Sequence, residues 1–336
     1  MFMRVSILDQ SPIATGSTAS EALAQTVRTA QLADDLGYHR FWVSEHHDAP
    51  GLAGSTPEVL LAHIGAKTKR IRLGSGGVML PHYSSYKVAE NFRMLEALYP
   101  GRIDLGVGRA PGGMPRSTIA LQGGRVPKAD YSQQVADLIA YITDSLPDNH
   151  PLYGLRARPI PEGVPELWLL GSSYGSAAIA AEHGTAFTFA HFINAEGGVE
   201  AVQMYRDRFQ PSRLYAEPEA SVAVFVFCAD TAEAAERLAM TMDLSLLMLA
   251  NGQRMEGTPT YEMARDYPYT ARERMVVREN RERMIVGDPV SVRQQLEAFA
   301  RRYGVDEVIV STRTPDFEDR LRTFELLADA MGLKGQ

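Results

Sequence analysis

The sequence predicts an α/β fold, a (β/α)8 TIM barrel of eight parallel strands and intervening helices, with insertions after the fourth and seventh strands. Three observations predict it. Eight apolar runs of strand length recur along the 336 residues, most of them are apolar throughout, and amphipathic helical patterns separate them. Continuously apolar strands indicate a parallel sheet that helices cover. Eight repeats of that unit close most naturally into a barrel.

The eight expected strands are short runs bounded by polar or turn residues. They are RVSIL (4–8), HRFWVS (39–44), IRLGSGGVML (71–80), RIDLGVG (102–108), ELWLLG (166–171), TAFTFA (185–190), ASVAVFVFC (220–228) and DEVIVST (306–312). No linker or low-complexity tract divides them, so we expect a single domain over residues 1–336.

Capping residues mark the helices between these strands. Thr18 and Glu21 form a capping-box pair, and Gly37 ends the helix that they begin. Residues 288–304 begin with Asp-Pro and end with Gly, which indicates another helix. A third expected helix, before the tripeptide YPG, has its apolar positions at Val88, Phe92, Leu95 and Leu98.

Two segments are longer than the connections of such a barrel require. Residues 109–128 follow the fourth strand and are rich in Gly, Pro and Arg, whereas residues 244–286 come after the seventh strand and its helix. Between residues 272 and 283 the second segment mixes five Arg with three Glu, which is typical of a solvated helix surface rather than of an RNA-binding patch. Both insertions are candidate lids over the catalytic face.

Composition favours a small-molecule partner. The formal net charge is -7 and the pI is about 5.7, so no basic field favours nucleic acid or an anionic membrane. The single cysteine, Cys228, excludes an internal disulfide and fits a reducing compartment. The N-terminus lacks the features of a signal peptide, and no apolar run has the length of a membrane span. We therefore expect a cytoplasmic protein.

A carboxylate and two imidazoles follow the second strand directly. Glu45, His46 and His47 stand where the residues after a barrel strand converge on the mouth, so we expect at least one imidazole to face it. The alternative is that one histidine caps a loop and the other packs beneath it. Asp48 and His82 are the nearest further metal ligands in the sequence, but they lack the spacing of a zinc motif, so we expect no metal.

Paired glycines interrupt the third strand, and an arginine follows the fourth. Gly76 and Gly77 indicate an unusual peptide or a flat ligand lying against the backbone, or else simple close packing. Arg109 suits a phosphate because its planar fork is always charged. It could equally pair with a carboxylate of the insertion.

A turn of small residues after the fifth strand runs into an Ala-rich helix. Ser172, Ser173, Gly175 and Ser176 place hydroxyls and backbone N–H groups at a helix N-terminus, which is a ready anion site or a plain serine cap. Together with Arg109 on the neighbouring strand, the turn could hold one phosphate. A phosphate grip, paired glycines for a flat ring and a histidine pair favour a flavin mononucleotide pocket over a metal hydrolase.

The stretch from EHHDAPG at residue 45 to GRAPGG at residue 113 resembles the core of the bacterial luciferase-like flavin monooxygenases. It is most similar to their single-chain branch. The resemblance implies a (β/α)8 barrel with long insertions and a homodimer. It also implies reduced FMN supplied by a separate NAD(P)H:flavin reductase, O2 as co-substrate and a small-molecule substrate.

The resemblance also assigns roles near the flavin ring. The first histidine of the motif, His46, resembles the family's catalytic base, and His47 is its catalytic neighbour in the pocket wall. Glu45 of the same motif counts with the cofactor-binding residues. The pair Gly76 and Gly77 matches the family's cis peptide, which contains no proline and lies under the ring.

On the phosphate side, Arg109 and the turn 172–176 match the family's grip. The sequence departs from the luciferases at Gly108 and Gly112, where they carry a cysteine and a tyrosine. This departure weighs against light emission and a long-chain aldehyde substrate.

These observations lead to one main hypothesis, an FMN-dependent monooxygenase that oxygenates a small organic substrate. A deazaflavin-dependent oxidoreductase and a flavin-binding accessory protein without turnover are the alternatives. Residues 56–66 and the helix 86–98 carry more apolar surface than one barrel face covers, which agrees with the homodimer that the resemblance implies.

Overall fold

The computed structural model describes residues 3–123 and 130–333 and confirms the barrel. All strand pairs are parallel, and the ring closes because the last strand pairs with both the first strand and β8. In the described residues the barrel consists of β1 (Arg4–Asp9), β2 (Arg40–Val43), β3 (Arg72–Ser75) with β4 (Val78–Met79), β5 (Ile103–Gly108), β6 (Glu166–Gly171), β7 (Ala186–Ala190), β8 (Ala220–Cys228) and β10 (Glu307–Ser311).

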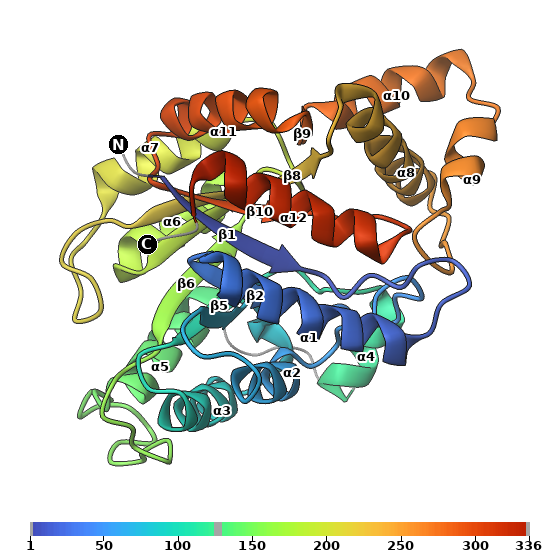
Figure 1. Cartoon of the computed structure of the whole chain (residues 1–336). Helices are drawn as coiled ribbons and strands as arrows, with labels where there is room; N and C mark the ends of the chain where they lie inside the picture. Colours follow the sequence, from blue (N-terminus) through green and yellow to red (C-terminus); the bar gives the residue numbers. More distant parts are fainter. Residues whose placement is uncertain (1–2, 124–129, 334–336) are drawn as a thin grey trace.

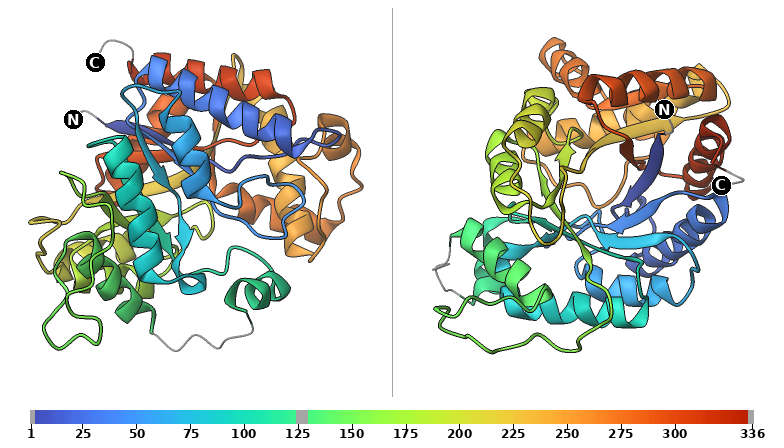
Figure 2. Two further views of the ribbon diagram at one scale, coloured as in Figure 1. Left: turned by 90° about the horizontal axis from the view of Figure 1, so that it is seen from below. Right: turned by 90° about the vertical axis from the view of Figure 1, so that its left-hand side faces the viewer.

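Helices surround this ring of strands, as the right-hand view of Figure 2 shows. They are α1 (Ala19–Leu36), α2 (Pro57–Gly65), α3 (Ser85–Leu98), α5 (Tyr131–Ile142), α6 (Tyr174–His183), α7 (Gly198–Arg208), α11 (Pro289–Tyr303) and α12 (Phe317–Met331), with a short 3-10 turn η1 (Leu80–His82) after β4. The predicted capping box of Thr18 and Glu21 is confirmed, and Gly37 ends α1 in the left-handed region. No helix in the described part of the chain is long and apolar enough to cross a membrane.

Both predicted insertions lie beyond the carboxyl ends of the strands. The first contains α4 (Pro115–Gln122), and its residues 124–128 lie outside the described residues. The second contains α9 (Tyr261–Asp266), α10 (Ala271–Arg281) and β9 (Met284–Gly287), and it follows α8 (Ala232–Ala250). In Figure 1 the β1 arrow points toward the side on which α4 and α9 lie.

Several boundaries differ from the sequence-based expectation. The third strand is divided into β3 and β4. The peptide bond between Gly76 and Gly77, at the point of division, is cis, which agrees with what the resemblance implies. Residues 244–250 belong to α8 rather than to the insertion. The strand β9, which the sequence did not predict, pairs with the carboxyl-terminal half of β8. Leu98 is 55% exposed instead of packing inward, because it lies at the last turn of α3, beyond the part of the helix that covers the barrel.

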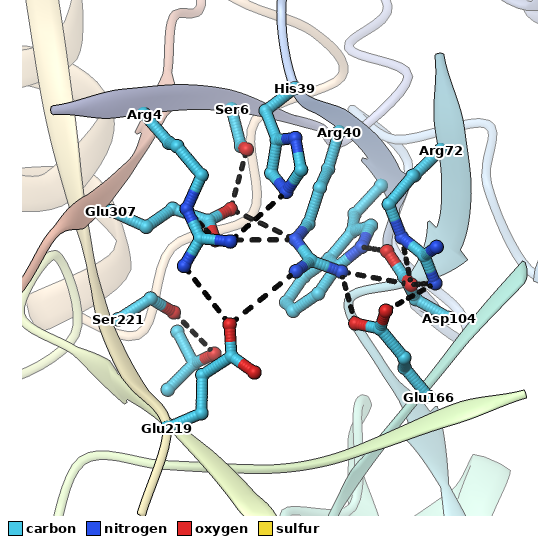
Figure 3. A network of polar contacts seen from close by, with 12 residues as sticks. Arg4, Ser6, His39, Arg40, Arg72, Asp104, Glu166, Glu219, Ser221 and Glu307 are labelled. Atoms are coloured by element: carbon cyan, nitrogen blue, oxygen red, sulfur yellow. Dashed lines mark hydrogen bonds and ion pairs between the residues drawn. The ribbon is translucent and has the colours of Figure 1, made fainter. Parts of the chain in front are cut away.

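A network of buried charges closes the amino end of the barrel (Figure 3). The guanidinium of Arg40 is 2% exposed and lies 2.9 Å from Asp104, 2.8 Å from Glu166 and 3.0 Å from Glu307. These partners belong to β5, β6 and β10, so the Arg40 side chain links its own strand, β2, to three others. The same guanidinium stacks over the ring of Trp168, 4.7 Å from its centroid.

Further contacts satisfy the carboxylates of this network. Asp104 also accepts hydrogen bonds from Arg72, at 2.9 Å, and from the indole of Trp42, at 2.8 Å. Glu307 accepts a hydrogen bond of 2.6 Å from the Ser6 hydroxyl. Because every buried carboxylate here has several donors, the cost of taking these charges out of water is offset by short contacts.

We expect Arg40→Gln to lower the free energy of unfolding by about 3 to 5 kcal/mol, because it removes the central buried cation that Asp104 and Glu307 share. Chemical denaturation measures the change. Arg28→Gln is the matched control: Arg28 is 61% exposed in its 3.2 Å pair with Glu318, and losing an exposed pair costs at most about 1 kcal/mol. Similar small losses in both variants would contradict the structural role of the network.

Candidate active site

A cavity of about 500 Å³ opens at the carboxyl ends of the strands. Its floor is apolar and includes Trp42, Ala223 and Ile309, which point inward from β2, β8 and β10. Its polar rim comes from the ends of β5 and β6 and consists of Arg109, Ser172, Ser173 and Ser176. An apolar floor with a few polar groups at one end is the usual composition of a cofactor or substrate pocket.

The glycine pair forms part of the cavity wall. A Cβ atom at Gly76 would lie 2.6 Å from Cδ1 of Leu8, and one at Gly77 would lie 2.8 Å from the carbonyl oxygen of Gly106. Close packing therefore requires glycine at both positions. The absence of side chains also leaves the backbone of this wall open to the cavity, so close packing and room for a flat ligand are compatible at this pair.

The predicted anion-binding residues converge in part. Arg109, Ser172, Ser173 and Ser176 line the same cavity, whereas Gly175 is exposed on the first turn of α6 and does not line it. The hydroxyl of Ser173 caps α6 and accepts a 3.4 Å hydrogen bond from the N–H of Ser176. The serine cap is thus present, and the same turn leaves hydroxyls at the cavity for the predicted anion site.

Tyr131, the first residue of α5, is a polar neighbour that the sequence did not reveal. Burial raises the pKa of its hydroxyl, and the charge of Arg109 acts in the opposite direction. The hydroxyl oxygen is buried and has no hydrogen-bond partner among the described residues. A phosphate between Arg109 and the serine turn would offer such a group an acceptor.

Glu45 organises the loop after β2. Its carboxylate is 1% exposed and accepts hydrogen bonds from the Tyr83 hydroxyl, at 2.8 Å, and the N–H of Met79, at 3.1 Å. The imidazole Nε2 of His47 lies 2.6 Å from the same carboxylate, and the backbone N–H of His47 donates to the carbonyl of Gly112. His47 and Glu45 therefore hold the loop against the first insertion, and neither is among the described residues that line the cavity.

His46 is half-buried and also stands outside the set of described residues that line the cavity. Its Nδ1 atom lies 3.0 Å from the hydroxyl of Ser44. Burial lowers the pKa of His46 to about 4, and the positive charge of Arg313 and the neighbouring His47 add to this effect. The sequence alone does not predict this lowering of the pKa, because it does not reveal burial beside Arg313. At neutral pH the ring is uncharged.

The residues that were weighed as metal ligands have other partners. Asp48 forms an ion pair of 3.0 Å with Arg254 of the second insertion, and Nε2 of His82 lies 2.7 Å from the carbonyl oxygen of Pro111. Within residues 3–123 and 130–333, no three His, Cys, Asp or Glu side chains form a group that could hold a metal ion.

The second insertion covers the loops after β1 and β2. The N–H of Thr258 donates to the carbonyl of Ile13, and the N–H of Thr15 donates to the carbonyl of Thr258. Together with the pair between Arg254 and Asp48, these bonds attach the insertion to the side of the mouth where β1 and β2 end. The position agrees with a lid.

Comparison with known proteins identifies relatives over the whole chain. A model of the luciferase-like monooxygenase family matches residues 3–307. The uncharacterized protein YwcH of Bacillus subtilis is 55% identical over 327 residues, which are 97% of this chain and 98% of that protein. The N-acetyl-S-alkylcysteine monooxygenase of the same organism is 40% identical over 332 residues, 98% of each chain. The crystal structure of apo-MsnO8 is 37% identical and superposes with a TM-score of 0.90, covering 100% of this chain and 99% of that one.

More distant structures share the barrel but bind different cofactors. The oxygenating constituent of 3,6-diketocamphane monooxygenase, solved with FMN, has a TM-score of 0.71 at 20% identity. An F420-dependent secondary alcohol dehydrogenase has a TM-score of 0.66 at 13% identity. They cover 98% of this chain, and 97% and 99% of their own chains respectively. At these low sequence identities, the similarity shows only that the fold is shared.

The lowered pKa of His46 predicts a pH dependence of stability. Since the folded pKa is below the ordinary value of 6.5, the neutral ring contributes stability above that pH and loses it as the pH falls toward 4. The loss has a slope of at most about 1.4 kcal/mol per pH unit. We expect the free energy of unfolding of the wild type to fall more steeply over this range than that of His46→Gln.

Denaturation at several pH values measures both slopes. His63→Gln is the control, because His63 is an exposed residue of α2, and this variant should follow the wild type. Parallel profiles for His46→Gln and the wild type would show that burial does not depress the pKa of His46.

Proposed function

The chain belongs to the luciferase-like monooxygenase family, and we propose that it uses reduced FMN and O2 to oxygenate a small organic substrate. The observation that carries this proposal is the convergence of Arg109 and three serines at one end of an apolar cavity whose wall contains the glycine pair. A volume of about 500 Å³ lies within the range of small-molecule and cofactor sites, roughly 300 to 1,000 Å³.

The residues present fit FMN. Arg109, Ser173 and Ser176 would hold its phosphate, because they offer a guanidinium fork and hydroxyls at the start of α6. The flat wall at Gly76 and Gly77 would take one face of the ring. Reduced FMN, when bound, supplies the electrons and the position at which O2 is activated.

The chain's own contribution is to orient the reactants, exclude water and hold a proton. The second insertion covers the mouth beside β1 and β2 and would limit the entry of water. His46 is neutral at pH 7, so it can accept a hydrogen bond or a proton from a reacting group. His47, held by Glu45, keeps the loop that carries His46 in place.

For substrate, partners and location we propose the following. A relative 40% identical over nearly the whole chain is named for N-acetyl-S-alkylcysteine, so small thioethers are the first candidates. A separate NAD(P)H:flavin reductase would supply the reduced cofactor, as membership of the luciferase-like family suggests. The buried free thiol of Cys228 fits the reducing cytoplasm.

Anaerobic titration with reduced FMN and with a reduced deazaflavin of the F420 type separates the main proposal from its alternative. We expect tight binding of FMN, followed by uptake of O2 and oxygenation when a thioether panel is added. Preference for the deazaflavin would replace the proposal with a hydride-transferring reductase. Tight binding of FMN without turnover would favour a flavin-binding accessory role.

Arg109→Gln should weaken FMN binding by roughly one to two decades, because a charge-assisted contact contributes about 1.5 to 3 kcal/mol. Fluorescence quenching of FMN measures the affinity. Arg116→Gln on α4 removes the same charge from an exposed position in the same insertion and should leave the affinity unchanged. If both substitutions weakened FMN binding equally, Arg109 would act only through the overall positive charge of this region and not through a contact with the phosphate.

We also propose a homodimer through α2 and α3. Val59 of α2 is 66% exposed, and Met94 and Leu98 of α3 are 50% and 55% exposed, which leaves an apolar surface on neighbouring helices. Sedimentation should give twice the 37.0 kDa of one chain. Val59→Asp should shift the protein toward the monomer, whereas Val290→Asp, at an equally exposed valine of α11, should not. A wild-type monomer at micromolar concentration would disprove the dimer.

A further inference from the structure

Next to the cavity, at the carboxyl ends of β1 and β10, lie polar side chains that neither the fold nor the proposed flavin contacts use. Leu8 of β1 and Ile309 of β10 line the cavity. Side chains alternate along a strand, so Ser311, two residues beyond Ile309 and the last residue of β10, faces the same interior as Ile309. Gln10 follows the end of β1 directly, and neither residue is among the described residues that line the cavity itself. Arg313 lies two residues beyond the end of β10, which pairs with β1, and it too stands outside the described lining of the cavity.

These three side chains contain buried polar atoms without partners. Gln10 is 8% exposed and Ser311 is 1% exposed. Among the described residues, the Oε1 atom of Gln10, the Oγ atom of Ser311 and the Nε atom of Arg313 have no hydrogen-bond partner. Buried polar groups are nearly always paired in folded proteins, and a cluster of unpaired ones at a cavity mouth indicates a ligand.

The buried charges around Arg313 include more cations than anions. Asp9 forms its ion pair with Arg320, at 3.8 Å, and accepts hydrogen bonds from the N–H of Ser11 and the hydroxyl of Thr26. Its charge also reaches Arg313, but two guanidiniums share this one carboxylate. Burial and the charge of Arg320 lower the pKa of Arg313 to about 10, so it remains a cation at neutral pH. Burying such a cation without an anion is costly.

We propose that Arg313 and Ser311, with Gln10 beside them, form a subsite for the carboxylate of the substrate, so that the molecule to be oxygenated is an organic acid. This inference rests on the proposed monooxygenase function, because only that function makes the bound acid the molecule that is oxygenated. The guanidinium and the hydroxyl of Ser311 donate hydrogen bonds to the carboxylate.

The subsite lies where a substrate can meet the ring without competing for the phosphate. β1 and β10 stand across the barrel from β5 and β6, which carry Arg109 and the serine turn. The apolar floor with Trp42 and Ile309 lies between the two cationic sides. His46 lies on the same side of the barrel mouth as Arg313, whose positive charge contributes to the lowered pKa of His46. An acid held at Arg313 would extend its uncharged part toward the apolar floor and the proposed flavin ring.

Calorimetric titration of the full chain, with and without oxidised FMN, tests the subsite. The probes are acetate, butyrate and hexanoate, each compared with its neutral amide. We expect at least one acid to bind the wild type about tenfold or more tightly than its amide, because it gains charge-assisted hydrogen bonds. In Arg313→Gln the ratio should fall to about one, and Arg313→Lys should retain part of it.

Two controls separate the subsite from general charge and from misfolding. Arg254→Gln removes an equal charge from an exposed residue of the second insertion and should keep the ratio of the wild type. Arg313→Gln should unfold at the same or a higher temperature than the wild type, because it removes an unpaired buried cation. Arg320→Gln should unfold at a lower temperature, because it leaves Asp9 unpaired.

Equal affinities for all acids and their amides in the wild type would overturn the subsite, and so would a ratio that persists in Arg313→Gln. Loss of affinity for reduced FMN in Arg313→Gln, with the ratio unchanged, would assign the arginine to the flavin and also overturn it. The outcome is independent of the proposed function, since acid binding is measured without turnover. A chain that prefers acids but does not use FMN would disprove the function and keep the subsite.

Discussion

The buried guanidinium of Arg40 is the constraint on which the rest of the structure depends. It joins carboxylates on β5, β6 and β10 from a position on β2, and these strands are far apart in the sequence. A buried ion pair contributes little net stability against an apolar core of the same shape, but removing one partner is severe. Its main effect is therefore to fix which residues oppose each other at the amino end of the barrel, and this register is transmitted along each strand to the mouth.

The cavity floor is held by that network. The indole of Trp42 donates to Asp104, and its ring, in edge contact with Trp168 at 5.6 Å between centroids, lines the cavity. Arg40 stacks on Trp168 from below. The barrel interior thus consists of a charged layer, an aromatic and aliphatic layer, and a polar mouth. Because each layer positions the next, the functional groups at the mouth stand on rigid strands, although they belong to loops and strand ends.

How much the sequence could reveal depended on whether a feature is local. Strand runs, the capping box at Thr18 and the glycine pair are properties of a few consecutive residues, and the structure agrees with them. The pKa of His46 was not accessible, because it depends on burial and on Arg313, 267 positions further along the chain. Ser311 also belongs to no sequence motif that would mark it as a ligand-binding residue. Its relation to the cavity follows only from the register between β1 and β10, which sequence periodicity does not specify.

The charge of the cavity differs in sign from the charge of the chain. A net charge of -7 disfavours nucleic acid, yet Arg109 lines the cavity, and the cation of Arg313 lies beyond the end of β10, across the barrel. Low-dielectric walls strengthen such local fields, while the many exposed carboxylates are screened by solvent. An acidic protein can therefore concentrate small anions in one cavity. The phosphate of a flavin and the carboxylate of an acid would enter from opposite sides and leave the apolar floor between them for the reacting parts.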